Sequence, residues 1–166
     1  GLLWTPVVDG DYLPCQPVVD SIVSQAKDIP LLIGTCMTEW TTMPLLSDSE
    51  RYAKDNTHTW SEEETMKKLQ ARFGNRTDSI ITAFRSAYPG RPISEALYID
   101  TMLRLPALKT ARLKADQHGA SVYNYLFAWD TPIHGGYAMT YHCSEIPFVF
   151  HNISLSPAAS AGGSEA

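Results

Sequence analysis

The chain has 166 residues, 44% of them apolar, and a formal net charge of −5 with acidic and basic residues interspersed. This composition is typical of one globular domain, or part of one, with a hydrophobic core, and it leaves no basic patch for a nucleic acid. The longest apolar stretches, such as PLLIG and PFVF, fall far below the ~20 residues of a membrane-spanning helix, so we expect neither a nucleic-acid partner nor a membrane span.

The first third of the chain predicts a loop, a helix and a strand. Residues 5–14 (TPVVDGDYLP) are extended and broken by an Asp-Gly turn. Residues 17–28 have helical spacing of their apolar side chains. Residues 29–35 (IPLLIGT) are a short apolar run bounded by Pro30 and Gly34, which is the pattern of a parallel strand buried on both faces.

Three helical stretches follow. Residues 61–74 open with Ser61 and Glu64 in capping-box spacing and end at a glycine. Residues 77–90 repeat the apolar stripe and end at a Pro-Gly pair. In a third stretch, residues 93–118, we expect Pro106 to break or kink the helix because proline removes a backbone donor and clashes with the preceding turn.

The last third predicts a second strand and a long loop. Residues 120–130 (ASVYNYLFAWD) are rich in aromatic and β-branched side chains between turn residues. A loop follows through residue 143, and IPFVF is the apolar run expected to anchor it to the core. Residues 154–166 are small and without periodicity, so we expect a flexible tail after a folded part that comprises residues 1–153.

Neither end of the sequence nor its cysteines identifies a compartment. The chain starts at GLLWTPVV, without an initiator methionine or a secretion signal, and we expect it to be part of something longer. Cys15, Cys36 and Cys143 are too few and too scattered for a disulfide framework, so free thiols are expected. The sequons at Asn75 and Asn152 would accept glycans in a secretory pathway.

Two polar residues follow the predicted strands where an α/β sheet carries its reactive groups. Glu39 lies just past the first strand, and His142 lies in the loop past the second. Loops beyond the carboxyl ends of parallel strands face a crevice while the strands hold them rigid. An acid followed by a histidine is the chain order of the α/β-hydrolase triad after its serine, yet no Gly-x-Ser-x-Gly occurs in the sequence.

The blocks PVVDGDYLP, IPLLIGTCMTEW, SVYNYLFAWD and HCSEIPFVF resemble, in order and approximate spacing, those of the type-B carboxylesterases, the cholinesterase-like family. The resemblance spans Thr5 to Asn152 and corresponds to the C-terminal part of the α/β-hydrolase fold. It implies mostly parallel strands with flanking helices, in a sheet that is incomplete in this chain. It also implies that Glu39 is the triad acid and His142 the triad base, while the nucleophile and the oxyanion loop lie upstream.

Three positions depart from the family pattern. Trp40 stands where the family has glycine after the acid, Cys143 where it has a small residue after the histidine, and His151 where it has glycine after PFVF. Glycine permits backbone paths that other residues resist. We therefore expect Trp40 to shift Glu39 or to reshape the pocket beside it.

Glu145 falls where the family keeps an acidic residue close to the triad, so it either supports the triad or serves as a helix cap or surface ion pair. A zinc site formed by His142, Cys143 and Glu145 is not expected, because adjacent side chains point apart and no fourth ligand is spaced nearby. No cofactor is predicted. The other histidines are expected in loop, surface or cap positions: His58, His118, His134 and His151.

The resemblance also implies a substrate pocket. Four residues lie near positions that line the acyl pocket in the family, with the hydrophobic core as the alternative: Leu2, Trp4, Thr42 and Met43. A mostly apolar lining suits a small uncharged carboxylic ester.

Two function classes remain open at this point. The first is a carboxylic-ester hydrolase whose serine lies outside this chain, and the second is a non-catalytic adhesion or interaction module on the same fold. An isolated chain of this kind would be inert toward esters. Its unpaired strand edges would require self-association or the upstream portion of the same protein.

Overall fold

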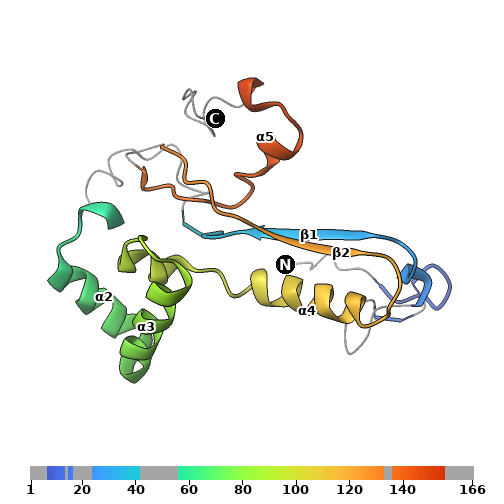
Figure 1. Ribbon diagram of the computed structural model, residues 1–166, viewed down its shortest axis with the longest axis horizontal. Coiled ribbons are helices and arrows are strands. Elements are labelled where there is room, and N and C mark those ends of the chain that lie inside the picture. Colours follow the sequence, from blue (N-terminus) through green and yellow to red (C-terminus); the bar gives the residue numbers. More distant parts are fainter. Residues whose placement is uncertain (1–6, 14, 17–23, 42–55, 133–135, 156–166) are drawn as a thin grey trace. The chain divides into compact units, whose positions relative to one another are not determined.

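The structure is a computed structural model that describes residues 7–13, 15–16, 24–41, 56–132 and 136–155. Two strands and four α-helices are described (Figure 1), namely β1 (Leu31–Cys36), α2 (Glu62–Phe73), α3 (Thr77–Ala87), α4 (Arg104–Ala115), β2 (Val122–Phe127) and α5 (Ile146–Val149). Short 3₁₀ helices are η1 (Ser24–Ala26), η3 (Thr57–Thr59), η4 (Gly74–Arg76), η5 (Ile93–Tyr98) and η7 (Ile153–Leu155). The chain divides into two compact units, residues 1–35 with 101–125, and residues 36–100 with 126–166.

The two strands pair in parallel. Near their starts the Leu31 N–H donates to the Ser121 carbonyl, and just past the end of β1 the Met37 N–H donates to the Phe127 carbonyl. The sequence offset is the same in both pairs, as a parallel register requires. At Gly34 a Cβ atom would lie 2.4 Å from the Tyr125 ring, so glycine lets the neighbouring strand's aromatic ring close onto the backbone.

The sequence predicted strands that are buried on both faces, but in this chain both strands leave apolar side chains exposed. Leu32 is 69% exposed and Tyr123 is 61% exposed. A strand run rich in apolar residues leaves such side chains in water only where covering elements are missing. Within the described part of the chain the sheet consists of these two strands, so it is incomplete, in agreement with the predicted fold class.

The first unit corrects the prediction for Pro106. Helix α4 begins at Arg104, and Pro106 lies in its first turn, where the missing N–H has no intrahelical partner in any case. The break occurs earlier, between η5 and α4. At the far end of α4, the buried Lys114 ammonium donates to the Lys27 carbonyl at 2.6 Å, which ties the helix to the turn before β1.

The second unit contains the hydrophobic core cluster. Helices α2, α3 and η5 supply Leu69, Ile81, Phe84 and Ala96, and Met37 from the end of β1 packs among them. Helix α2 begins as predicted, with the Ser61 hydroxyl accepting the Glu64 N–H, and ends at Gly74 with φ 56°. The helical core therefore packs against the segment that leads from β1 to Glu39.

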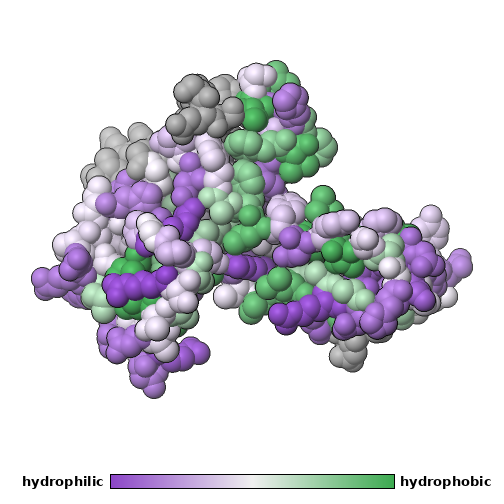
Figure 2. Space-filling model, viewed as in Figure 1, coloured by the Kyte–Doolittle hydropathy of each residue, from purple (hydrophilic) through white to green (hydrophobic). Residues whose placement is uncertain are grey.

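The C-terminal apolar run forms helix α5, and only part of it packs against other residues of the chain. Phe148 contacts the Phe127 and Trp129 rings, with centroid separations of 5.2 and 5.0 Å. Val149 and Phe150 are 64% and 71% exposed, and Figure 2 shows apolar surface over this helix. The anchoring predicted for IPFVF thus involves Phe148 and the buried Pro147.

Two predicted segments fall largely outside the described residues. Of the helix predicted over residues 17–28, residues 17–23 are not described, and η1 follows them. The predicted tail begins inside η7, and residues 156–166 are not described. No helix of the described part is long and apolar enough to cross a membrane.

Candidate active site

Glu39 and His142 are in direct contact, within the second unit. The Nδ1 atom of His142 lies 2.5 Å from Oε2 of Glu39, and the His142 backbone N–H donates to the Glu39 carbonyl at 2.9 Å. The Glu39 side chain is 5% exposed, whereas that of His142 is 30% exposed. The acid is therefore enclosed, and the imidazole reaches the surface of the described structure.

The second oxygen of the carboxylate is also used. Oε1 of Glu39 accepts the backbone N–H of Cys36 at 2.7 Å. A charge-assisted bond from a fixed backbone donor orients the carboxylate, so that Oε2 is directed at the imidazole. Because Nδ1 is engaged by Glu39, the ring nitrogen left for another proton partner is Nε2.

Paired threonines join the loop that carries Glu39 to the loop that carries His142. The hydroxyl and the N–H of Thr38 both donate to the Thr140 carbonyl, at 3.0 and 3.2 Å. In return the Thr140 N–H donates to the Thr38 hydroxyl at 3.0 Å. The Thr41 hydroxyl bonds the Thr38 and Ala138 carbonyls. These contacts fix the spacing of the two loops next to both site residues.

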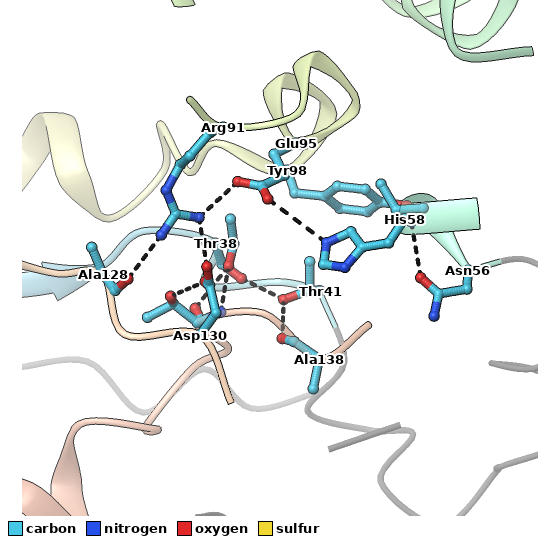
Figure 3. A network of polar contacts seen from close by, with 12 residues as sticks. Thr38, Thr41, Asn56, His58, Arg91, Glu95, Tyr98, Ala128, Asp130 and Ala138 are labelled. Atoms are coloured by element: carbon cyan, nitrogen blue, oxygen red, sulfur yellow. Dashed lines mark hydrogen bonds and ion pairs between the residues drawn. The ribbon is translucent and has the colours of Figure 1, made fainter. Parts of the chain in front are cut away.

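An arginine holds the start of the loop that carries His142 (Figure 3). The Arg91 guanidinium donates to Glu95 at 2.7 Å, lies 2.9 Å from Asp130, and bonds the Ala128 carbonyl. Asp130 in turn accepts the hydroxyl of Thr140 at 2.9 Å. A continuous chain of contacts therefore runs from Arg91 to the threonine pair beside Glu39.

Trp40 lies against the site, and Glu39 keeps its contact with His142 beside it. The reshaped pocket expected from the sequence stays a prediction. The Trp40 indole stacks on the His142 imidazole with ring centroids 5.2 Å apart and an interplanar angle of 19°. The indole N–H donates to Asp100 at 3.3 Å. Among the described non-glycine residues, four have positive φ, and Trp40 is not one of them: His118, Met139, Cys143 and His151. Two of these are the other departures from the family pattern, so the left-handed backbone occurs at Cys143 and His151.

Glu145 is joined to the segment that carries Glu39 by a bond from Cys36. The Cys36 thiol donates to Oε2 of Glu145 at 2.9 Å. Burial, together with this bond to a carboxylate, raises the pKa of the Cys36 thiol to about 12. Glu145 precedes α5, but its side chain makes no capping bond, so its contact is with the residue whose N–H orients Glu39.

The sequence matches the Carboxylesterase family over residues 1–164. The chain belongs to this family. It is 28% identical over 152 residues to the para-nitrobenzyl esterase of Bacillus subtilis (strain 168). The alignment covers 92% of this chain and 28% of that protein. A solved structure of an esterase from anaerobic Clostridium hathewayi, described as able to hydrolyze aliphatic aromatic polyesters, matches with a TM-score of 0.71. Its sequence is 38% identical, and the match covers 82% of this chain and 25% of that one.

This member of the Carboxylesterase family therefore spans about a quarter of the length of the relatives that it matches. The predicted fold, part of an α/β hydrolase, is confirmed by the structural match. The four residues predicted to line the acyl pocket lie outside the described residues, as does His134: Leu2, Trp4, Thr42 and Met43. The described residues contain no group of three or more His, Cys, Asp or Glu that could hold a metal ion.

His58 is an exposed residue, as the sequence predicted, but its contact with a carboxylate was not predicted. Its Nε2 atom lies 3.7 Å from Oε1 of Glu95, and its side chain is 29% exposed. Sequence reasoning also missed Arg91 as a central residue. The Arg91–Glu95 spacing of four was a visible signal for their pairing, but nothing local pointed to Asp130.

Proposed function

We propose that this chain supplies the acid and the base of a serine carboxylesterase, with Glu39 and His142 in those roles. The serine nucleophile and the oxyanion-hole donors would come from the upstream portion of the family fold, which this chain does not include. Family membership and two esterase relatives support ester hydrolysis as the activity of the whole protein.

The observation that carries the proposal is the paired use of the Glu39 carboxylate. One oxygen accepts a backbone N–H, and the other contacts Nδ1 of His142 at 2.5 Å. This arrangement fixes the imidazole tautomer with its proton on Nδ1 and a lone pair on Nε2. A surface ion pair would not need an enclosed acid with both oxygens assigned.

The chemistry follows from that tautomer. A serine hydroxyl attacks the ester carbonyl carbon while its proton passes to Nε2 of His142. The tetrahedral intermediate collapses when the same proton is given to the leaving alcohol. Water then attacks the acyl-enzyme as its proton passes to His142. The second intermediate collapses to the free acid while His142 returns that proton to the serine oxygen. Glu39 stabilises the imidazolium in both steps and is not itself protonated.

Small uncharged carboxylic esters are the substrate class we propose. A para-nitrobenzyl esterase and an esterase that hydrolyzes aliphatic aromatic polyesters are both relatives, and both names indicate esters with an aromatic component. The pocket that would bind them includes Leu2, Trp4, Thr42 and Met43, as the sequence predicts. Glu145 would support the triad through its bond with Cys36.

The upstream portion is also the proposed partner of the exposed apolar surfaces. Leu32 and Tyr123 on the strands and Phe150 after α5 are all more than half exposed. Apolar side chains of strands in an open α/β sheet are ordinarily covered. In the isolated chain we expect these surfaces to drive self-association.

The alternative is a non-catalytic interaction module, since one fold hosts unrelated functions. The test labels the full-length protein with an organophosphonate that reacts only with an activated serine. Covalent labelling of one serine outside this chain, absent in His142→Ala, supports the enzyme. The chain alone should hydrolyse a short-chain aryl ester no faster than free imidazole. Absence of labelling in folded wild-type protein, or serine-inhibitor-sensitive turnover by the chain alone, would refute the proposal.

A further inference from the structure

We propose that Trp40 is a positioning residue for His142, which fixes the plane of the imidazole and stabilises its positive charge when it takes up a proton. The inference rests on the proposed role of His142 as the base. It assigns to this chain an aromatic support that the acid and base alone do not provide.

The imidazole is held at one edge and on one face. The Glu39 carboxylate holds Nδ1, but a single bond to one ring atom leaves the ring able to tilt about that contact. The Trp40 indole lies nearly parallel to the ring, at 19°, with centroids 5.2 Å apart. Face contact restricts the tilt that the hydrogen bond allows, and with it the direction of Nε2.

Within this chain, hydrophobic burial does not account for the place of Trp40. The residue is 51% exposed here, so contacts inside the chain bury only about half of it. Its position is set by a polar contact, because the indole N–H donates to Asp100 at 3.3 Å and Asp100 is only 3% exposed. The bond to the buried Asp100 carboxylate holds the half-exposed indole in place. Its face is thereby held against the imidazole.

The stack stabilises the charged ring more than the neutral one. A cation over the face of tryptophan is attracted by the ring quadrupole, whereas a neutral imidazole gains only dispersion and packing. In the proposed reaction His142 becomes positive only as the serine is deprotonated. An interaction that strengthens in the transition state raises kcat and leaves substrate binding unchanged.

The test uses the full-length protein and a short-chain aryl ester. Trp40→Ala should lower kcat about 3- to 10-fold, the loss expected for one partly exposed cation–π contact, with KM within about twofold. Trp40→Phe keeps an aromatic face and should recover most of the loss. Trp60→Phe is the matched control, since that indole contacts Lys68, at 4.2 Å, and should leave both constants unchanged.

Indole emission gives a readout that does not depend on activity. Protonated imidazole quenches a stacked indole, so the emission of wild type minus that of Trp40→Phe should fall on acidification. The same difference measured in a His142→Asn background should not change with pH. Because this measurement needs no Trp40→Ala protein, it decides the matter even if that variant does not fold.

The outcomes separate this inference from the proposed function. A rise in KM with unchanged kcat in Trp40→Ala would mean that Trp40 contacts substrate and would overturn the inference, as would emission insensitive to His142. If His142→Ala retains full activity, the proposed function fails, while the emission measurement still reports whether the rings are stacked.

Discussion

Replacing Glu39 by glutamine should remove most of the turnover of the full-length protein without unfolding it. The two carboxylate oxygens face two different donors, the backbone N–H of Cys36 at 2.7 Å and Nδ1 of His142 at 2.5 Å. Glutamine has one acceptor and one donor group in their place. Only one of the two contacts can therefore be kept in its native sense.

The backbone donor decides which contact survives. The Cys36 N–H can only donate a hydrogen bond, so the amide oxygen of the glutamine turns to it and the amide NH₂ faces His142. Nδ1 must then accept, which places the imidazole proton on Nε2, where the base needs its lone pair. The opposite orientation leaves two donors facing each other, at a cost of about 1–3 kcal/mol, and so is populated about 15% or less.

The minor orientation restores the tautomer but not the negative charge that stabilises the imidazolium, so the two losses multiply. We expect kcat to fall by about 10³- to 10⁴-fold, as in the serine-protease variant with the equivalent amide. The assay is hydrolysis of a short-chain aryl ester, with circular dichroism to establish that the variant is folded. Glu63→Gln is the matched control, because Glu63 lies exposed in the first turn of α2 and the same substitution there should leave kcat unchanged. A folded Glu39→Gln protein with kcat within about tenfold of wild type would refute the reasoning.

Arg91→Met should destabilise the protein by about 2–3 kcal/mol, because it leaves the 3%-exposed Glu95 side chain without the Arg91 guanidinium. A free energy of unfolding within about 0.5 kcal/mol of wild type in a urea titration would contradict this. Cys36 should resist a disulfide reagent at pH 8 while the exposed Cys15 reacts, since the pKa of the buried Cys36 thiol is about 12. Because that pKa lies above its ordinary value of 9.0, stability is retained below pH 9 and lost as pH rises toward 12, a loss that Cys36→Ala should reduce. Cys143→Gly should not destabilise the fold. Glycine removes the backbone strain of a left-handed residue at φ 69°, which offsets the added entropy of the unfolded chain, about 0.5–1 kcal/mol. Cys143→Ala keeps the strain and is the control, so a glycine variant less stable than the alanine variant would contradict the argument.

Local signals in the sequence predicted the elements that local forces determine. The Ser61 cap and the glycine stop of α2 are present as predicted, because a cap satisfies backbone donors within one turn. Both strands were predicted from short apolar or aromatic runs between turn residues. The contact between Glu39 and His142 was expected from their positions after two parallel strands and from the family resemblance, and the structure contains it.

Tertiary contacts explain what sequence alone did not predict. Pro106 was expected to interrupt a helix that in fact starts two residues earlier, and helix boundaries depend on the packing of neighbouring turns. Trp40 was expected to shift Glu39 or reshape the pocket because it stands where the family has glycine, but its stack on the His142 ring could not be read from the sequence. The pairing of Arg91 with Asp130 joins residues far apart in sequence, so no local pattern reveals it.

The central claim is that His142 is the base of an ester hydrolase, and one rate constant tests it most directly. The kcat of full-length His142→Ala on a short-chain aryl ester should be lower than that of wild type by about 10⁴-fold or more. The variant should remain folded, because the His142 side chain is 30% exposed and its backbone bond to Glu39 does not depend on the ring. A folded His142→Ala protein that turns over at the wild-type rate would contradict the account.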